Sequence, residues 1–202
     1  MAGVEGEIKR EELDALREAR RRLALAQVRQ YPDAALRLRA NEATEFDASL
    51  AGLADRIGHL MREANGVGLA ATQIGVLQRV FVYQVGEEEP LVALVNPVVV
   101  ERSEERDTAE EGCLSLGAAA VVVDVERAVA VTVEASSPDG KPLRIEAEGL
   151  EARVIQHEID HLDGVLIIDR ASPEQRRSAL AQLRPQPVFA RETAGAFSRE
   201  DA

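Results

Sequence analysis

The spacing of hydrophobic residues divides the chain into helical stretches and a series of strands. A period near 3.6 predicts helices over residues 10–30 and 46–64, while short valine-rich or alternating runs predict strands. These strands are expected near residues 79–85, 91–101, 119–125, 128–136 and 142–148, with Pro138-Asp139-Gly140 as a hairpin turn. Strands followed by a central helix favour an α+β fold with antiparallel sheets around that helix. Pro173 begins a further, C-terminal helix.

The central helix is expected to be short, rigid and largely buried. Apolar residues cover much of its circumference, namely Leu150, Val154, Ile155, Ile159 and Leu162. Gly149 marks its entry and Gly164 suits a left-handed C-terminal cap. Within it, His157 and His161 stand four residues apart, so both imidazoles project from one face and can bind one metal ion.

Glu158 follows the first histidine of this pair. It is turned by about 100° around the helix axis, which suits a base acting on water better than a third ligand. The alternative is a helix whose histidines are ordinary surface or core residues. Asp160 could orient a ligand imidazole, but an exposed or ion-paired carboxylate is the favoured interpretation.

A third metal ligand must come from another segment. In zinc proteases it would lie downstream, but Ile167 occupies the place of the extra histidine, and Glu174 falls in a solvated helix start after Ser172 and Pro173. Cys113 is the better candidate. It is the only cysteine, so it forms no intrachain disulfide.

Cys113 stands in Glu111-Gly112-Cys113-Leu114-Ser115, between stretches that indicate strands. A lone cysteine could simply be a small buried hydrophobe. A thiolate with two imidazoles, however, leaves one coordination position open, as catalytic metal sites do. Because Gly112 has no side chain, the backbone beside Cys113 can approach another group closely.

A glycine cluster at residues 66–75 precedes the strands. It has neither the strand before it nor the helix after it that a nucleotide loop needs, so a structural turn is the plain interpretation. The functional interpretation is that Gly66 and Gly68 let the backbone pass near the metal while Gln73 offers an amide donor.

Three segments in order resemble the signatures of the peptide deformylases. They are Gly66-Val67-Gly68-Leu69-Ala70-Ala71-Thr72-Gln73, Glu111-Gly112-Cys113-Leu114-Ser115 and His157-Glu158-Ile159-Asp160-His161, within a resemblance that runs from about Tyr31 to Leu183. The resemblance implies an α+β fold of antiparallel sheets around the metal helix. It also implies hydrolytic removal of the formyl group from the N-terminal methionine of newly made polypeptides.

The resemblance further implies roles for individual residues. Cys113, His157 and His161 would bind one divalent ion, with Fe²⁺ favoured over Zn²⁺ or Ni²⁺. Glu158 would move the proton, and the Gln73 amide and Leu114 backbone N–H would stabilise the oxyanion.

The substrate peptide is expected to lie as an extra strand against Val67, Gly68 and Leu69, with its methionine in an apolar pocket. Val67, Leu150 and Val154 are candidate pocket walls, although core packing would explain them equally well. One stretch departs from the family: residues 116–125 lack the family's proline and arginines. A deformylase-like hydrolase with altered or lost specificity is therefore the alternative.

Composition narrows the function class. The 202 residues, 46% of them hydrophobic, can bury one substantial core, and no apolar run is long enough to span a membrane. The acidic start at residues 1–7 does not resemble a secretory signal, so the cytoplasm is the expected location. A net charge of −12 with 3% aromatic residues argues against direct nucleic-acid binding.

Three regions are expected. Residues 1–30 form a helical extension whose arginine-rich part is a solvated face or a transient ribosome contact, residues 31–183 form the catalytic domain, and residues 184–202 form a mobile tail. Formyl-methionyl nascent peptides are the expected partners. Two other classes stay open: a different metallohydrolase with a downstream third ligand, and a metal-storage or ribosome-associated protein without turnover.

Overall fold

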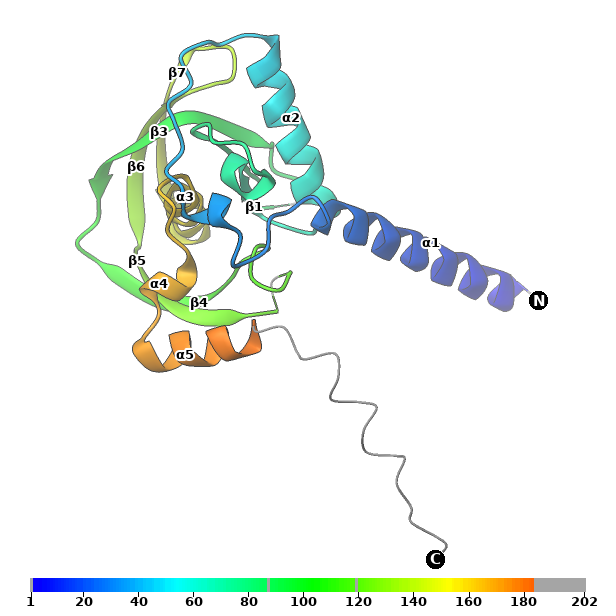
Figure 1. Ribbon diagram of the computed structural model, residues 1–202. Helices are drawn as coiled ribbons and strands as arrows, with labels where there is room; N and C mark the ends of the chain where they lie inside the picture. The colour runs from blue at the N-terminus through cyan, green and yellow to red at the C-terminus, as the bar shows by residue number, and fades with distance from the viewer. Residues whose placement is uncertain (1, 87, 119, 184–202) are drawn as a thin grey trace, which may run out of the picture.

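A computed structural model describes residues 2–86, 88–118 and 120–183 and shows an α+β fold (Figure 1). Five antiparallel strands form one sheet in the order β1-β2-β3-β6-β7, and two strands form a second sheet, β4-β5. The first sheet comprises β1 (Gly68–Ala70), β2 (Val80–Tyr83), β3 (Val92–Arg102), β6 (Ala130–Ser136) and β7 (Pro142–Glu148); the second comprises β4 (Arg106–Gly112) and β5 (Val122–Ala128).

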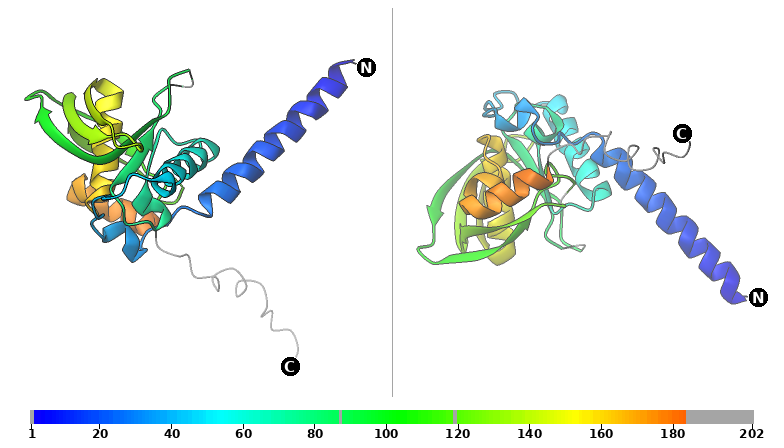
Figure 2. Two further views of the ribbon diagram at one scale, coloured as in Figure 1. Left: turned by 90° about the horizontal axis from the view of Figure 1, so that it is seen from above. Right: turned by 60° about the horizontal axis from the view of Figure 1, so that its bottom comes forward.

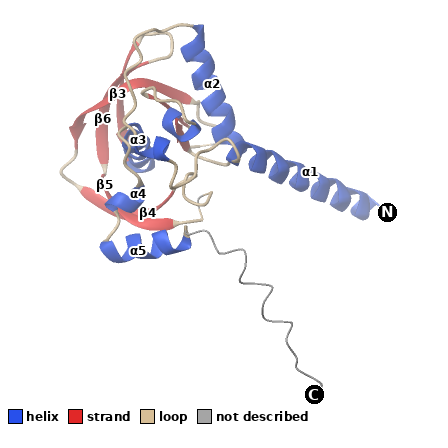
Figure 3. Ribbon diagram, in the orientation of Figure 1, coloured by secondary structure: helices blue, strands red, loops and turns tan. Residues whose placement is uncertain are grey.

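The helix α3 (Gly149–Leu162) lies at the centre of the fold, with the strands curving around it (Figures 1 and 3). α2 (Ala48–Glu63) packs on β1 and β2, and α5 (Pro173–Gln182) packs on β5. The short α4 (Ile167–Arg170) joins α3 to α5. The predicted fold class, antiparallel sheets around a central helix with a helix at the C-terminal end, is confirmed.

α3 is buried because apolar side chains occur all around it. Ala152, Val154, Ile155 and Leu162 are all under 9% exposed. The helix begins at Gly149, whose φ is +56°, and is followed by Gly164, whose φ is +75°. A Cβ at Gly164 would meet the carbonyl carbon of Arg37 at 2.8 Å, so a side chain there would clash with backbone. Both ends of the helix are thus fixed by glycines, as the sequence predicted.

The hairpin between β6 and β7 turns at the predicted residues. Gly140 has φ +81°, and the backbone N–H of Ser137 donates to the Lys141 carbonyl at 2.9 Å. The predicted strand at 119–125 is wrong by a few residues, since β5 starts at Val122 and runs to Ala128. Gly117 and Ala118 both have positive φ, so the chain first turns before it can extend.

β4 was not among the predicted strands. Its sequence, Arg106 to Gly112, has mostly polar and acidic side chains, so it lacks the apolar alternation that marks a strand. Pairing with β5 at every position holds it extended. It ends at Gly112, and the chain turns after Cys113, at Leu114 and Ser115.

The N-terminal helix α1 spans Ala2–Leu25, not residues 10–30 as predicted, and it projects from the body of the fold (Figures 1 and 2). It ends at Leu25 because the following residues enter the fold: Val28 is buried beside α2, and the backbone of Arg29 and Tyr31 pairs with other loops. The predicted tail at residues 184–202 lies outside the described residues, and the proposed division into three regions stays a prediction. Within the described chain, no helix has both the length and the apolar character that crossing a membrane requires.

Candidate active site

Cys113, His157 and His161 meet beside α3. One potential ligand atom from each lies within 4.8 Å of the other two, and Cys113 Sγ is 3.2 Å from His161 Nε2. Metal–sulfur and metal–nitrogen bonds of about 2.0–2.3 Å require such a spacing around a shared ion. A thiolate and two imidazoles on rigid elements therefore fit a divalent metal, and no other group of three His, Cys, Asp or Glu residues in the described chain does so.

Glu111 orients the first of these imidazoles. His157 Nδ1 lies 2.9 Å from Glu111 Oε2, which leaves Nε2 to face the cysteine. Glu111 in turn accepts hydrogen bonds from Arg127 Nε at 2.8 Å and from Arg153 Nη1 at 2.9 Å. Burial alone would raise the pKa of Glu111, but the hydrogen bonds from Arg127 and His157 outweigh it and hold this pKa well below its usual range. The carboxylate thus stays ionised behind the imidazole.

The two histidines differ in their affinity for protons. Burial lowers the pKa of His157, but its hydrogen bonds with Cys113 and Glu111 outweigh that effect and raise the pKa to about 10. Burial and the nearby His157 and Arg127 hold the pKa of His161 well below its usual value. A metal that binds here would therefore compete with a proton at His157, whereas the low pKa of His161 favours its neutral form.

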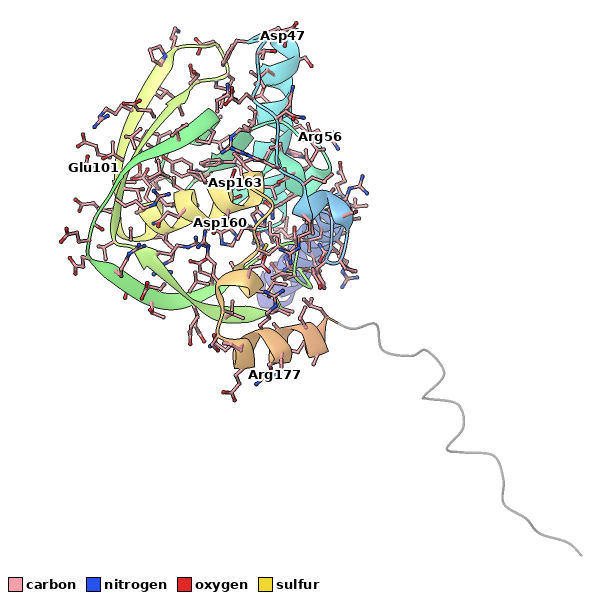
Figure 4. All side chains as sticks on the ribbon, turned by 60° about the vertical axis from the view of Figure 1, so that its left-hand side comes forward. Asp47, Arg56, Glu101, Asp160, Asp163 and Arg177 are labelled. Carbon is pink, nitrogen blue, oxygen red and sulfur yellow. The ribbon has the colours of Figure 1, made fainter. Side chains whose placement is uncertain are left out.

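Asp160 does not touch the ligand imidazoles. It accepts a hydrogen bond from Arg127 Nη1 at 2.6 Å and pairs with Arg170, near the end of α3 where Figure 4 labels it together with Asp163. The expected ion-paired carboxylate is therefore present, although it is buried rather than exposed. Arg127 bridges Asp160 to Glu111, which in turn contacts His157.

Glu158 is 3% exposed, and its Oε2 has no hydrogen-bond partner in the described residues. Burial raises its pKa to about 7. Gly68 of β1 passes so close that a Cβ there would lie 2.9 Å from the Glu158 carboxyl carbon. The interpretation that glycine lets this backbone approach the centre is supported, and Glu158 occupies a position suited to exchanging a proton near neutral pH.

The Gln73 amide is held in one orientation. Its Oε1 accepts a hydrogen bond from the Ala70 N–H at 2.8 Å, so Nε2 points toward Ser115 Oγ at 3.2 Å and Cys113 Sγ at 3.8 Å. Residues 26–31, which follow α1, form an N-terminal connector. Gln30 Nε2 of this connector donates to the Leu114 carbonyl at 2.9 Å and so holds the adjoining turn.

The same connector holds both loops together. The Arg29 N–H donates to the Gln73 carbonyl at 2.7 Å, and the Tyr31 N–H donates to the Ser115 carbonyl at 2.9 Å. Sequence reasoning missed these contacts and the role of Glu111, although Glu111 stands inside the motif that identified Cys113.

Gln73, Glu111, Cys113, His157 and Glu158 line one cavity of about 250 Å³. Gly66, Val67 and Gly68 contribute one stretch of its lining. Glu110, Gly112 and Leu114 contribute a second stretch. Leu150 and Val154 of α3 add apolar surface, while His157 and Glu158 supply the polar groups. Such a cavity, apolar with a few convergent polar groups, is typical of a site for a small substrate group.

Comparison with known proteins agrees with this geometry. The family model for polypeptide deformylase matches residues 25–177. The chain belongs to the peptide deformylase family. A relative from Corynebacterium glutamicum, peptide deformylase 1, is 41% identical over 169 residues, which cover 83% of this chain and 99% of the relative.

Solved deformylase structures have the same fold. The structure from Legionella pneumophila has a TM-score of 0.73 at 41% identity and covers 77% of this chain and 91% of its own. That from Thermotoga maritima has a TM-score of 0.69 at 44% identity, covering 72% of this chain and 97% of its own. Family membership makes the chain a hydrolase. It therefore argues against the alternative of a metal-storage or ribosome-associated protein without turnover.

The remaining predicted residues fall into three groups. Val67, Gly68, Leu150 and Val154 line the cavity, but the Leu69 side chain is fully buried in the core beside α2. Glu174 is exposed at the start of α5, and Ile167 is buried in the core, so neither offers a downstream ligand.

The stretch that departs from the family contributes no described residue to the lining of the cavity. None of its described residues, 116–118 and 120–125, lines the cavity; Leu116 and Val121 instead pack in the core near α5. The alternative of altered specificity is accordingly not favoured. Two arginines still reach the site, Arg127 from β5 and Arg153 from α3.

Replacing Glu111 by glutamine should weaken metal binding in this deformylase about 10- to 100-fold. The amide keeps the size of the side chain but removes the charge that fixes the His157 ring and raises its basicity as a ligand. Competition with a chelator would measure the change. Glu126→Gln on the exposed side of β5 is the matched control, and equal affinities for both variants would show that Glu111 does not tune the metal site.

Proposed function

We propose that Cys113, His157 and His161 bind one divalent metal and that Glu158 is the proton-transfer group of a peptide deformylase. The reaction is hydrolysis of the formyl amide at the N-terminal methionine of newly made polypeptides, which yields formate and a free amine. The observation that carries the proposal is the buried Glu158 carboxylate, whose Oε2 has no hydrogen-bond partner in the described residues and which lines the same cavity as Cys113 and His157. Protonation near neutral pH suits a group that must accept and return a proton.

A bound metal would supply Lewis acidity, which activates water and polarises the formyl carbonyl. The family favours Fe²⁺, and Zn²⁺ or Ni²⁺ are alternatives because a mixed sulfur and nitrogen ligand set accepts all three. Glu111 supports the site by holding the His157 ring through Nδ1.

Glu158 then accepts a proton from the attacking water and delivers it to the departing amine. The carbonyl oxygen gains negative charge as the water attacks, and we assign Gln73 Nε2 and the Leu114 backbone N–H as the two donors that stabilise it. The Ala70 contact fixes the amide so that its N–H₂ faces the site before substrate arrives. Preorganised donors of this kind cost no reorganisation during the reaction.

The peptide binds along β1. This strand is the edge of its sheet in the described structure, because β2 is its only neighbour. Pairing with Val67 and Gly68 would extend the sheet by one strand, and Leu69 contributes to that pairing through its backbone alone. Val67, Leu150 and Val154 form the apolar wall for the methionine side chain. Val67 and Leu150 are 48% and 57% exposed, which suits surfaces that substrate covers.

Formate release from formyl-Met-Ala-Ser tests the proposal when it is compared with release of acetate from acetyl-Met-Ala-Ser. We expect turnover of the formyl peptide alone, since the formyl group is the smallest acyl group and the cavity is partly filled by the methionine side chain. Comparable turnover of both peptides would instead indicate a general amidase. The cytoplasmic location and a transient ribosome contact remain part of the same proposal, in keeping with a nascent-chain substrate.

A further inference from the structure

The projecting helix α1 exposes an apolar face. Leu13, Leu16 and Leu23 are 55%, 48% and 70% exposed. At 100° per residue they fall within about 80° of one another around the axis, so they form one stripe. Among residues 13–25 of α1 only Ala24 is buried, and the ribbon of α1 projects away from the body of the fold (Figure 2). Three leucines in line on a solvated helix indicate an interaction surface.

The stripe continues into a hollow between α1 and α2. The hollow measures about 320 Å³ and is lined by Leu23, Ala24 and Gln27 on one side and by His59 and Leu60 on the other. A helix lying along the leucine stripe would reach this hollow and could place an apolar side chain in it.

Charge along α1 is divided between its two halves. Residues 2–14 contain five acidic and two basic side chains, whereas residues 15–25 contain four arginines and one glutamate. Within one helix, Arg17 pairs with Asp14, and Arg21 and Arg22 pair with Glu18, but Arg20 has no ion-pair partner in the described residues. A second, oppositely directed α1 would set each acidic half against a basic half.

We propose that α1 is a self-association surface, on which the α1 of a second copy packs antiparallel. The two-fold symmetry of such a pair makes the same stripe serve both partners. In the register that sets Leu13 of one copy against Leu23 of the other, the second copy's Leu13 also covers the hollow beside α2. A parallel pair would align acidic with acidic and basic with basic halves, so the charge pattern favours the antiparallel arrangement. The metal site takes no part in this contact, so the proposal is independent of the deformylase activity.

Charge reversal tests whether the charged halves of α1 take part in the contact. One variant carries Arg17, Arg20, Arg21 and Arg22 changed to Glu, and the other carries Glu5, Glu7, Glu11 and Glu12 changed to Lys. Sedimentation equilibrium of the full chain should show a wild-type dimer at a concentration on the order of 100 µM, where a dissociation constant of about 10 µM would populate it. Each variant alone should be monomeric, and an equimolar mixture of the two should form heterodimers.

The apolar stripe is tested with Leu16→Asp against Ala15→Asp, which adds the same charge to an exposed neighbour about 100° around the helix. We expect Leu16→Asp to be monomeric and Ala15→Asp to remain dimeric, with unchanged helix content and formate release in both. A monomeric wild type, a mixture of reversed variants that does not associate, or a dimer that survives Leu16→Asp would each overturn the proposal. If the wild type is monomeric and binds ribosomes through α1, the leucine stripe contacts the ribosome instead of a second copy.

Discussion

Glu158→Gln should lower kcat/KM for formyl-Met-Ala-Ser by about 10²- to 10⁴-fold while the metal content stays at one ion per chain. The amide has nearly the same shape as the carboxylate, but it can neither accept the proton of the attacking water nor return it to the amine. The three proposed metal ligands are untouched. Because Glu158 Oε2 has no hydrogen-bond partner in the described residues, the substitution breaks no hydrogen bond of that atom, and the fold should be at least as stable.

Formate release, metal analysis and thermal unfolding of the same preparation would check this result. Glu151→Gln is the matched control, since Glu151 lies in the first turn of the same helix and accepts a hydrogen bond from the Tyr83 hydroxyl, which glutamine can also accept. We expect the control to keep wild-type turnover. Retained turnover in Glu158→Gln would mean that another group moves the proton, and a loss of metal would mean that Glu158 helps to hold the ion.

The relative positions of three candidate site residues could be predicted from sequence because they depend on local geometry. His157, Glu158 and His161 are fixed relative to one another by the helix alone, and the apolar residues around them indicate that this helix is central. Cys113 and Gln73 could be named as candidates from their residue types and motifs, but nothing in their spacing shows that two loops 40 residues apart meet at one point.

The supporting groups could not be predicted in the same way. Arg127 lies 16 residues from Glu111 and 33 from Asp160, and only the pairing of β4 with β5 and their packing beside α3 bring the three together. β4 itself was missed because its inward residue near the site is the charged Glu111 rather than an apolar side chain. The charge of Glu111 therefore has two consequences. It interrupts the apolar alternation that would have marked β4 as a strand, and it holds the His157 imidazole through Nδ1.

His161→Ala should abolish both metal binding and deformylation. Removing one of three protein ligands leaves a thiolate and one imidazole, which cannot hold a catalytic ion against water and buffer. The side chain is 2% exposed, so its loss also creates a cavity and lowers stability regardless of metal. Activity alone therefore cannot separate a lost ligand from a weakened fold.

The response of unfolding to added metal separates the two effects. A metal at about 100 times its dissociation constant stabilises the folded chain by about 2.7 kcal/mol, which raises the thermal midpoint of the wild type. In His161→Ala the midpoint should be lower at the outset and should not respond to metal. His59→Ala provides the control, because His59 is the only other histidine in the chain besides His157 and is exposed on α2. That variant should keep the full metal-dependent rise and the full rate of formate release. A normal rise in His161→Ala would remove His161 from the ligand set and leave Cys113 and His157 in need of a different third ligand.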